Sequence, residues 1–173
     1  MNGSTPIFPQ PSQEEPLFSP DTPTPPRPVL VSACLLGLAT RYDGQSKANS
    51  RVFDYLRARN LLPIPICPEQ LGGLATPRSP ARFHSGDGEG LWMEQGELVN
   101  QEGESMNTAF IRGAEETLRI ARLTGCRTAI LKERSPSCGV HRIHRREGLT
   151  AGSGVAAALL RQAGLSLISD DDL

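Results

Sequence analysis

Three short apolar segments, each followed by a cysteine, constrain the fold of this chain more than any other feature. Two of the segments run directly into Cys34 and Cys67, and the third, residues 127–131, leads into a Ser-Pro-Ser turn that ends at Cys138. Short, continuous apolar segments are typical of strands that are buried on both faces of a parallel sheet. Because the loops after the carboxyl ends of such strands meet at one edge of the sheet, the pattern predicts that these three cysteines lie together.

Helical patterns separate the strand-like segments. Apolar residues recur at helical spacing over residues 51–59 and 106–124, and Gly125 is a suitable C-terminal stop for the second helix. A last helix is expected to open at Gly152-Ser-Gly154 and to be followed by a strand at residues 165–168. Alternating strands and helices imply parallel crossover connections. The sequence therefore predicts the α/β class, with a Rossmann-like, mostly parallel sheet and flanking helices in a single domain.

Three stretches fit this pattern less well. Pro63 and Pro65 lie inside the second predicted strand, and because proline cannot donate to a ladder, this strand is expected at an edge or to be irregular. Within residues 74–104, Leu91-Trp-Met93 and Glu97-Leu-Val-Asn100 are interpreted as a short hairpin or a pair of turns. Residues 142–146 hold the basic cluster of the chain, which we interpret as a solvated turn, with an anion or phosphate contact as the alternative.

Composition limits the cellular setting and the partners. Residues 1–28 contain nine of the fifteen prolines, so we expect a disordered tail there and a folded domain over residues 29–173. The chain has no secretory signal pattern and no apolar run near the ~18 residues that a membrane span needs. A formal net charge of -1 argues against a large nucleic-acid surface. We expect a cytoplasmic protein, monomeric or dimeric, without a membrane or long nucleic-acid partner.

Cysteine chemistry is the next constraint. The chain has four cysteines and no C-x-x-C pair, and Cys126, just before a strand, is expected to be a buried small residue. Three thiolates in one pocket are compatible with a zinc site, with an iron–sulfur cluster that has one open iron, or with a catalytic cysteine and its resolving partner. Spacing does not separate zinc from a cluster. Crowded thiolates repel one another, which counts against three free thiols.

Polar residues are expected at the same edge of the sheet. Glu69 follows Cys67 by two positions and could act as a general base or could simply brace its loop. Ser135 and Ser137 flank Pro136, where they could orient a substrate or cap the turn. The other candidates for the lining of the cleft, each with a solvated charge or a plain turn as the alternative, are Lys132, Asp43 and Gly44.

Six sequence motifs of the chain form a recognisable combination. In chain order they are Val31-Ser-Ala-Cys-Leu-Leu-Gly37, Arg41-Tyr-Asp-Gly44, Cys67-Pro-Glu-Gln-Leu-Gly-Gly73, Phe110-x-x-Gly-Ala114, Leu131-Lys-x-x-Ser-Pro-Ser-Cys-Gly139 and Gly152-x-Gly-Val-x-Ala-Ala-Leu-Leu160. In this combination the chain resembles the thiouracil desulfurase family, from about Val29 to its last residues. The resemblance implies a [4Fe–4S] cluster held by Cys34, Cys67 and Cys138, with one iron free of protein ligands.

The resemblance also implies an activity. Members of the family remove sulfur from a thiolated pyrimidine, giving the oxo-pyrimidine and sulfide without net redox change. The open iron would act as a Lewis acid on the thiocarbonyl sulfur before water attacks the ring carbon. Glu69 would activate the water or pass protons, and Ser135 would position substrate or protons. Two rival interpretations are a zinc- or cluster-binding sensory protein without turnover and a metal-free thiol oxidoreductase.

The sequence departs from the family pattern in two places. The entry to the long helix reads Ser105-Met-Asn-Thr108, and residues 142–148 are more basic than usual. These segments raise the question of whether the substrate is free thiouracil or a thiouridine nucleotide. The basic residues suggest the hypothesis that Arg142, Arg145 and Arg146 contact a substrate phosphate.

Overall fold

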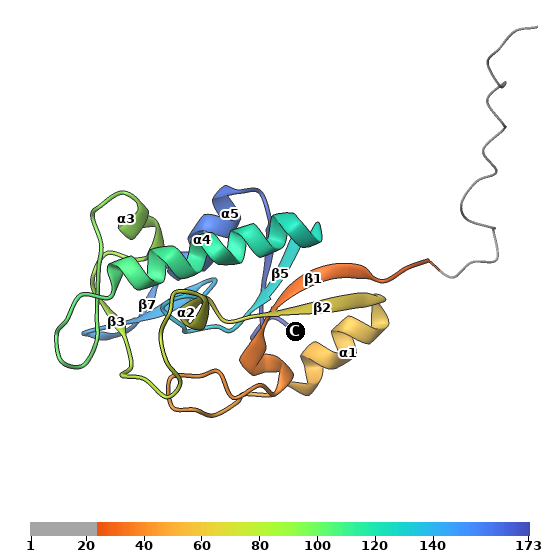
Figure 1. Ribbon diagram of the computed structural model, residues 1–173, viewed down its shortest axis with the longest axis horizontal. Helices are drawn as coiled ribbons and strands as arrows, with labels where there is room; N and C mark the ends of the chain where they lie inside the picture. The colour runs from red at the N-terminus through yellow and green to blue at the C-terminus, as the bar shows by residue number, and fades with distance from the viewer. Residues whose placement is uncertain (1–23) are drawn as a thin grey trace, which may run out of the picture.

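A computed structural model describes residues 24–173, and its architecture is shown in Figure 1. Its first sheet has four strands, all of which run parallel to their neighbours. The short apolar segments that end before the predicted site form its central and edge strands, so the predicted Rossmann-like α/β arrangement is confirmed. In spatial order the strands are β2 (Leu61–Ile66), β1 (Arg27–Ser32), β5 (Thr128–Leu131) and β8 (Ser166–Ser169).

The edges of this sheet agree with the proline pattern. β2 lies at one edge, so Pro63 and Pro65 sit where a missing ladder donor is tolerated, as predicted. β1 begins at Arg27, two residues before the expected start of the folded domain. The prediction of a disordered tail falls, for residues 1–23, outside the part of the chain that the structure describes.

Helices cover both faces of the parallel sheet (Figure 1). α1 (Ser50–Ala58) packs on one face through Val52 and Leu56, and the side chain of Asn49 caps it by accepting the amide of Arg51 at 3.1 Å. On the other face lie α4 (Asn107–Thr124) and α5 (Val155–Gln162). α4 ends at Gly125, whose φ of 68° is the left-handed conformation that glycine adopts at low cost.

A second, mixed sheet was not predicted. It consists of β4 (Glu97–Val99), β3 (Arg82–Ser85), β6 (Arg142–Arg145) and β7 (Gly148–Ala151), with the short helix α3 (Gly88–Trp92) between β3 and β4. The interpretation of the basic cluster as a solvated turn is wrong for Arg142–Arg145, which form β6 of an antiparallel hairpin, whereas Arg146 is exposed in the turn before β7. The interpretation of residues 91–93 and 97–100 as a hairpin is wrong, because Leu91 and Trp92 belong to α3, and β4 pairs instead with β3 as an antiparallel strand.

α4 and α5 unite the two sheets. The first half of α4 buries Phe110 and Ala114 against the second sheet, and its second half buries Leu118 and Ala121 against the first. α5 contributes to both clusters in the same way. The long helix crosses above both sheets in Figure 1, so the described residues form one domain.

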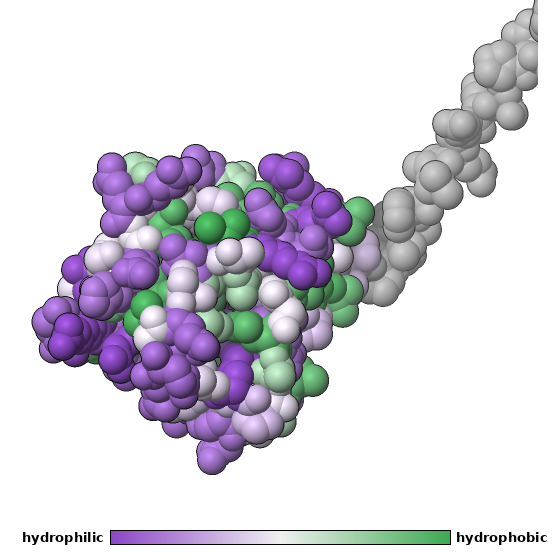
Figure 2. All heavy atoms as spheres, turned by 60° about the vertical axis from the view of Figure 1, so that its left-hand side comes forward, coloured by the Kyte–Doolittle hydropathy of each residue, from purple (hydrophilic) through white to green (hydrophobic). Residues whose placement is uncertain are grey.

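The face drawn in Figure 2 is mostly polar, with apolar residues in small patches between the polar ones. Within residues 24–173, no helix has the length and apolar character required to cross a membrane.

Candidate active site

Three cysteines line one cavity at the carboxyl edge of the parallel sheet. Cys34 follows β1, Cys67 directly follows β2, and Cys138 comes seven residues after β5. Because β1 lies between β2 and β5, the three loops are neighbours in space. The cavity has a volume of about 540 Å³, and Cys34, Cys67, Cys138, Glu69, Lys132 and Ser135 all line it.

The Cys67 loop is held against the long helix by two glycines. Cys67 stands directly before the single helical turn α2 (Pro68–Leu71), whose proline occupies the first turn, where no amide donor is needed. A β-carbon at Gly113 of α4 would lie 1.8 Å from the carbonyl oxygen of Pro68, and one at Gly72 would lie 2.1 Å from that of Ala109. Only glycine permits this approach. The backbone that carries Cys67 is therefore fixed on a rigid helix.

The Cys138 loop is seated on the N-terminus of α5. The amide of Val155 donates to the carbonyl of Pro136 at 2.9 Å, and the amide of Ala156 donates to that of Ser137 at 2.9 Å. The hydroxyl oxygen of Ser135 accepts the amides of Ser137 and Cys138, each at 3.1 Å. With its oxygen occupied in this way, Ser135 has its hydroxyl proton to offer to the cavity.

Glu69 is part of a nearly buried ion pair. Its Oε2 accepts a hydrogen bond of 2.7 Å from Nε of Arg78, and the two side chains are only 14% and 8% exposed. Arg78 comes from the loop after α2 and also lines the cavity. No local sequence pattern indicates this arginine, apart from its place between Pro77 and Pro80.

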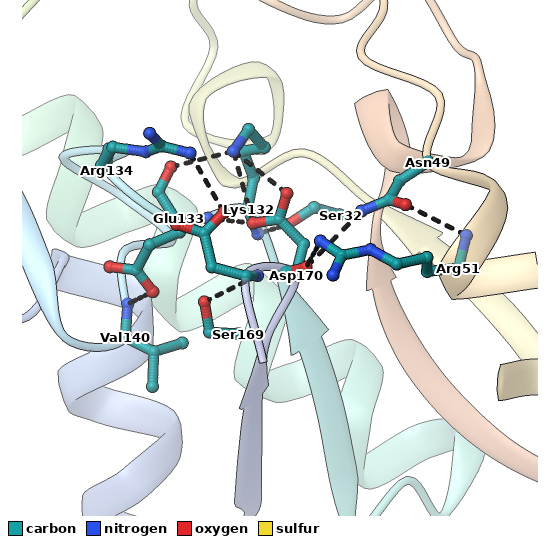
Figure 3. Close-up of polar contacts among 10 residues, drawn as sticks. Ser32, Asn49, Arg51, Lys132, Glu133, Arg134, Val140, Ser169 and Asp170 are labelled. Atoms are coloured by element: carbon teal, nitrogen blue, oxygen red, sulfur yellow. Dashed lines mark hydrogen bonds and ion pairs between the residues drawn. The ribbon is translucent and has the colours of Figure 1, made fainter. Parts of the chain in front are cut away.

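A second buried network braces the loop that carries Ser135 and Cys138 (Figure 3). The ammonium of Lys132 pairs with Oδ2 of Asp170 at 3.1 Å and donates to the carbonyl of Glu133 at 3.3 Å. Oδ1 of Asp170 accepts the amide of Glu133 at 2.6 Å. Asp170 follows β8, so the end of one strand fixes the start of the loop after its neighbour.

Glu133 completes this network and was missed by the sequence analysis. Its carboxylate accepts three successive amides, from Val140 at 3.2 Å, His141 at 3.1 Å and Arg142 at 2.7 Å. Burial acts to raise the pKa of Glu133, but the hydrogen bonds from Ser169 and from these amides outweigh it, so the pKa is lowered. An ionised carboxylate therefore holds the far end of the Cys138 loop.

Electrostatics disfavour free thiolates at this edge. Burial, followed by the proximity of Cys67, raises the pKa of Cys34 to about 11. Burial also raises the pKa of Cys138, and the neighbouring Cys34, Cys67 and Glu69 add to this effect. Cys34 and Cys138, which are destabilised as thiolates, need a cationic group beside them to become ligands. The donor set therefore fits a positively charged metal centre.

The geometry also bears on the kind of centre. Among residues 24–173, no three His, Cys, Asp or Glu side chains converge closely enough to hold a single metal ion. In an iron–sulfur cluster each cysteine binds its own iron, which spreads the sulfur ligands over a larger volume. The arrangement of Cys34, Cys67 and Cys138 around one cavity is compatible with a cluster.

Comparison with known proteins agrees with this arrangement. The family model described as 2-thiouracil desulfurase matches residues 29–172. The chain belongs to the 2-thiouracil desulfurase family. Its relatives include the uncharacterized protein YbbK of Bacillus subtilis strain 168, which is 38% identical over 148 residues covering 84% of this chain and 97% of YbbK. A solved structure, the [4Fe–4S]-dependent thiouracil desulfidase TudS, is 43% identical with a TM-score of 0.72 over 85% of this chain and 93% of that one.

Some residues singled out from the family motifs do not line the cavity. Asp43 pairs through Oδ2 with Arg41 at 2.9 Å, and this guanidinium lowers the pKa of Asp43 to about 2. Arg41 is the member of the pair that lines the cavity. Gly44 lies in the same turn, with a φ of 72°. Ser137 is buried behind the cavity wall, and no hydrogen-bond partner for its hydroxyl lies among residues 24–173.

Basic residues show the same division. Arg142, Arg145 and Arg146 do not line the cavity, whereas His144 of the same hairpin does. Lys132 lines the cavity, but its ammonium is engaged by Asp170. Cys126 lies at the opposite edge of the sheet, buried in the apolar core as expected.

Proposed function

We propose that this chain is an iron–sulfur-dependent desulfurase that replaces the sulfur of a thiolated pyrimidine with oxygen from water. The observation that carries the proposal is the single cavity that Cys34, Cys67 and Cys138 share with Glu69 and Ser135. Membership of the 2-thiouracil desulfurase family and likeness to the [4Fe–4S]-dependent desulfidase TudS support both the cofactor and the reaction.

Cys34, Cys67 and Cys138 would hold the [4Fe–4S] cluster. Three cysteines for four irons leave one iron without a protein ligand, which is the condition for a substrate atom to bind there. When bound, the cluster supplies a Lewis acid for the thiocarbonyl sulfur, which makes the adjacent ring carbon electrophilic. Lys132 and Arg41 also line the cavity and contribute positive charge around the sulfur ligands.

Glu69 is the proposed base. Its carboxylate lines the cavity two residues after Cys67, where it can accept a proton from the attacking water. Ser135 is the proposed donor, because its hydroxyl proton is available after its oxygen has accepted two amides. The net reaction is balanced: water supplies the oxygen, and the sulfur leaves as hydrogen sulfide with the two protons of that water. No electron acceptor is required.

We further propose thiouracil or a thiouridine nucleotide as the substrate. Lys47 and Arg82 line the cavity in addition to Arg41 and Lys132, so its charge suits a phosphorylated substrate as well as a free base. The values of kcat/KM for 2-thiouracil and for thiouridine monophosphate distinguish the two. Substitution of Arg82 with alanine lowers only the nucleotide value if a phosphate is bound there.

The remaining proposals concern the setting of the enzyme. All four cysteines are free, which suits the reducing cytoplasm. A monomer or a dimer is proposed, and light scattering after size exclusion distinguishes them. We propose that residues 29–173 carry the activity, so a chain that lacks residues 2–23 should retain the kcat/KM of the full chain.

Anaerobic reconstitution tests the function directly. About four irons and four labile sulfides per chain, with a broad visible absorption band, are expected. The loaded protein should then convert 2-thiouracil into uracil and release one sulfide per turnover. Iron without turnover of any thiolated pyrimidine would favour a sensory protein. Redox-dependent disulfides in an active, metal-free protein would favour a thiol oxidoreductase.

A further inference from the structure

Arg78 is the most completely bonded cation in the cavity wall, and the proposed function gives it no role. Its Nε donates to Oε2 of Glu69 at 2.7 Å. Its Nη1 donates to the carbonyl of Ala75 at 3.2 Å and to the hydroxyl of Thr76 at 3.0 Å. Its Nη2 donates to the carbonyl of Thr40 at 3.1 Å. Every nitrogen of this guanidinium is therefore engaged, and the side chain is only 8% exposed.

The same arginine joins two of the three cysteine loops. Thr40 belongs to the segment after Cys34, and the backbone amide of Arg78 donates to the carbonyl of Tyr42 in that segment at 2.8 Å. The thiol of Cys67 also reaches the Thr40 carbonyl, at 3.6 Å. Arg78 thus fixes the Cys34 segment, the Cys67 loop and Glu69 relative to one another.

The two carboxylate oxygens of Glu69 differ in their hydrogen bonding. Oε2 is held by Arg78, whereas Oε1 makes no hydrogen bond within residues 24–173. The other nitrogens of Arg78 fix the guanidinium itself, so its Nε holds Oε2 of Glu69 at one place, which a lysine ammonium with its single point charge does not do. Within residues 24–173, Oε1 is therefore the oxygen of Glu69 that is left to accept a proton.

We infer that Arg78 is a positioning residue for the desulfurase reaction, which holds Glu69 with one oxygen directed at the attacking water. The inference rests on the proposed base role of Glu69. A residue that only braces the fold would affect stability and cluster content when it is changed. A positioning residue affects kcat while the cluster and the substrate affinity remain, because misalignment of a base slows the chemical step.

Arg78→Lys is the decisive variant, since it keeps the positive charge and removes the planar group whose donors are fixed by several acceptors. We expect kcat to fall by about 10- to 100-fold, with KM, iron per chain and the visible spectrum unchanged. Arg57→Lys is the matched control, because Arg57 lies exposed on α1 and outside the cavity. Wild-type kcat in Arg78→Lys, or a loss of activity that follows a loss of iron in proportion, would overturn the inference.

A double-mutant cycle tests the coupling of the two residues both in turnover and in stability. If Arg78 acts through Glu69, adding Arg78→Lys to Glu69→Gln should lower kcat by less than twofold further. Independent, multiplying effects would contradict the inference. Urea midpoints of the four cluster-free proteins should also be non-additive, because the two side chains form one buried pair. An inactive wild-type protein with a full cluster would refute the proposed function, while additive midpoints would refute the pair itself.

Discussion

The two edges of the parallel sheet each contain a cavity and a buried cysteine, but only one of them is organised for chemistry. At the amino edge, a cavity of about 330 Å³ is lined by Cys126 together with Leu118, Ala121 and Leu165. Burial raises the pKa of Cys126, and a contact of 3.1 Å with the hydroxyl of Thr124 acts weakly in the other direction. Arg122 and Arg127 line this cavity without an acidic residue.

The carboxyl edge differs from the amino edge in the arrangement of its charged residues, and not in the burial of its cysteines. There the charged residues lie in pairs, such as Glu69 with Arg78 and Lys132 with Asp170, and each pair fixes a loop that carries a cysteine. Burial alone makes a thiol inert, as at Cys126. What distinguishes the reactive edge is the number of sulfurs that converge and the buried charges that hold their loops in place.

Cysteine substitutions should give the largest difference between the edges. Changing Cys34, Cys67 or Cys138 singly to alanine should reduce the iron content from about four per chain to nearly none and abolish turnover. Cys126→Ala is the matched control and should keep the iron content and the turnover, because Cys126 lines the cavity at the amino edge. Iron analysis after anaerobic reconstitution provides the measurement. Equal losses in all four variants would remove the distinction between the edges.

Glu69 should affect turnover without affecting the cluster. Glu69→Gln keeps the size of the side chain but cannot accept a proton, so kcat should fall by about 10²- to 10⁴-fold with iron per chain unchanged. Glu89→Gln serves as the control, because Glu89 forms an exposed pair with Arg161 outside the cavity. A Glu69→Gln enzyme with wild-type kcat would exclude this carboxylate as the base.

The adjacent aspartates Asp170 and Asp171 test whether burial of the charges matters. Asp170→Asn leaves the ammonium of Lys132 buried without its partner and should lower the free energy of unfolding by about 3–5 kcal/mol. Asp171→Asn removes an ion pair with Arg134 in which both side chains are nearly half exposed, and should cost at most about 1 kcal/mol. Urea denaturation of the cluster-free proteins compares them. Equal costs would mean that Asp170 does not brace the site.

The sequence was sufficient to predict the parallel sheet and its cysteines because both follow from local patterns. Each strand is a continuous apolar run, and parallel topology brings the ends of such runs together whatever the details of the loops. The same reasoning missed the second sheet. Its strands are short and mostly polar, and β3 pairs with β6 across about 60 residues of chain. Such pairing depends on the packing of α4 and α5, which no local pattern reveals.

The site was predictable to a similar extent. Glu69 and Ser135 were found because they are close in sequence to cysteines. Arg78, Glu133 and Asp170 were missed because their roles depend on partner groups that lie near them only in the folded chain. For Asp170 and Lys132, the two members of one ion pair are 38 residues apart. Asp43, which belongs to a family motif, was predicted to line the cavity. It does not line the cavity but forms an ion pair with Arg41, which does.

The smallest expected effect concerns Glu133 and depends on pH. Its pKa is lower in the folded chain than its ordinary value of 4.5, so the unfolded chain takes up the proton first as the pH falls. The stabilisation by this carboxylate is therefore complete well above pH 4.5 and is lost as the pH falls toward the pKa of the folded chain. Glu133→Gln should cost about 1–3 kcal/mol at neutral pH, because the amide group presents a donor to three backbone donors.

The difference in unfolding free energy between wild type and Glu133→Gln should thus be constant from about pH 7 to about pH 5.5 and should narrow below about pH 4.5. Urea titrations across this range measure it. Glu116→Gln is the control, since Glu116 forms only a surface pair with Arg119 on α4 and should show little pH dependence. A difference that widens as the pH falls would mean that Glu133 is held in its protonated form. The loop of the carboxyl edge would then be held by a neutral hydrogen bond, and the contrast with the Cys126 cavity, which no carboxylate of residues 24–173 lines, would be weaker.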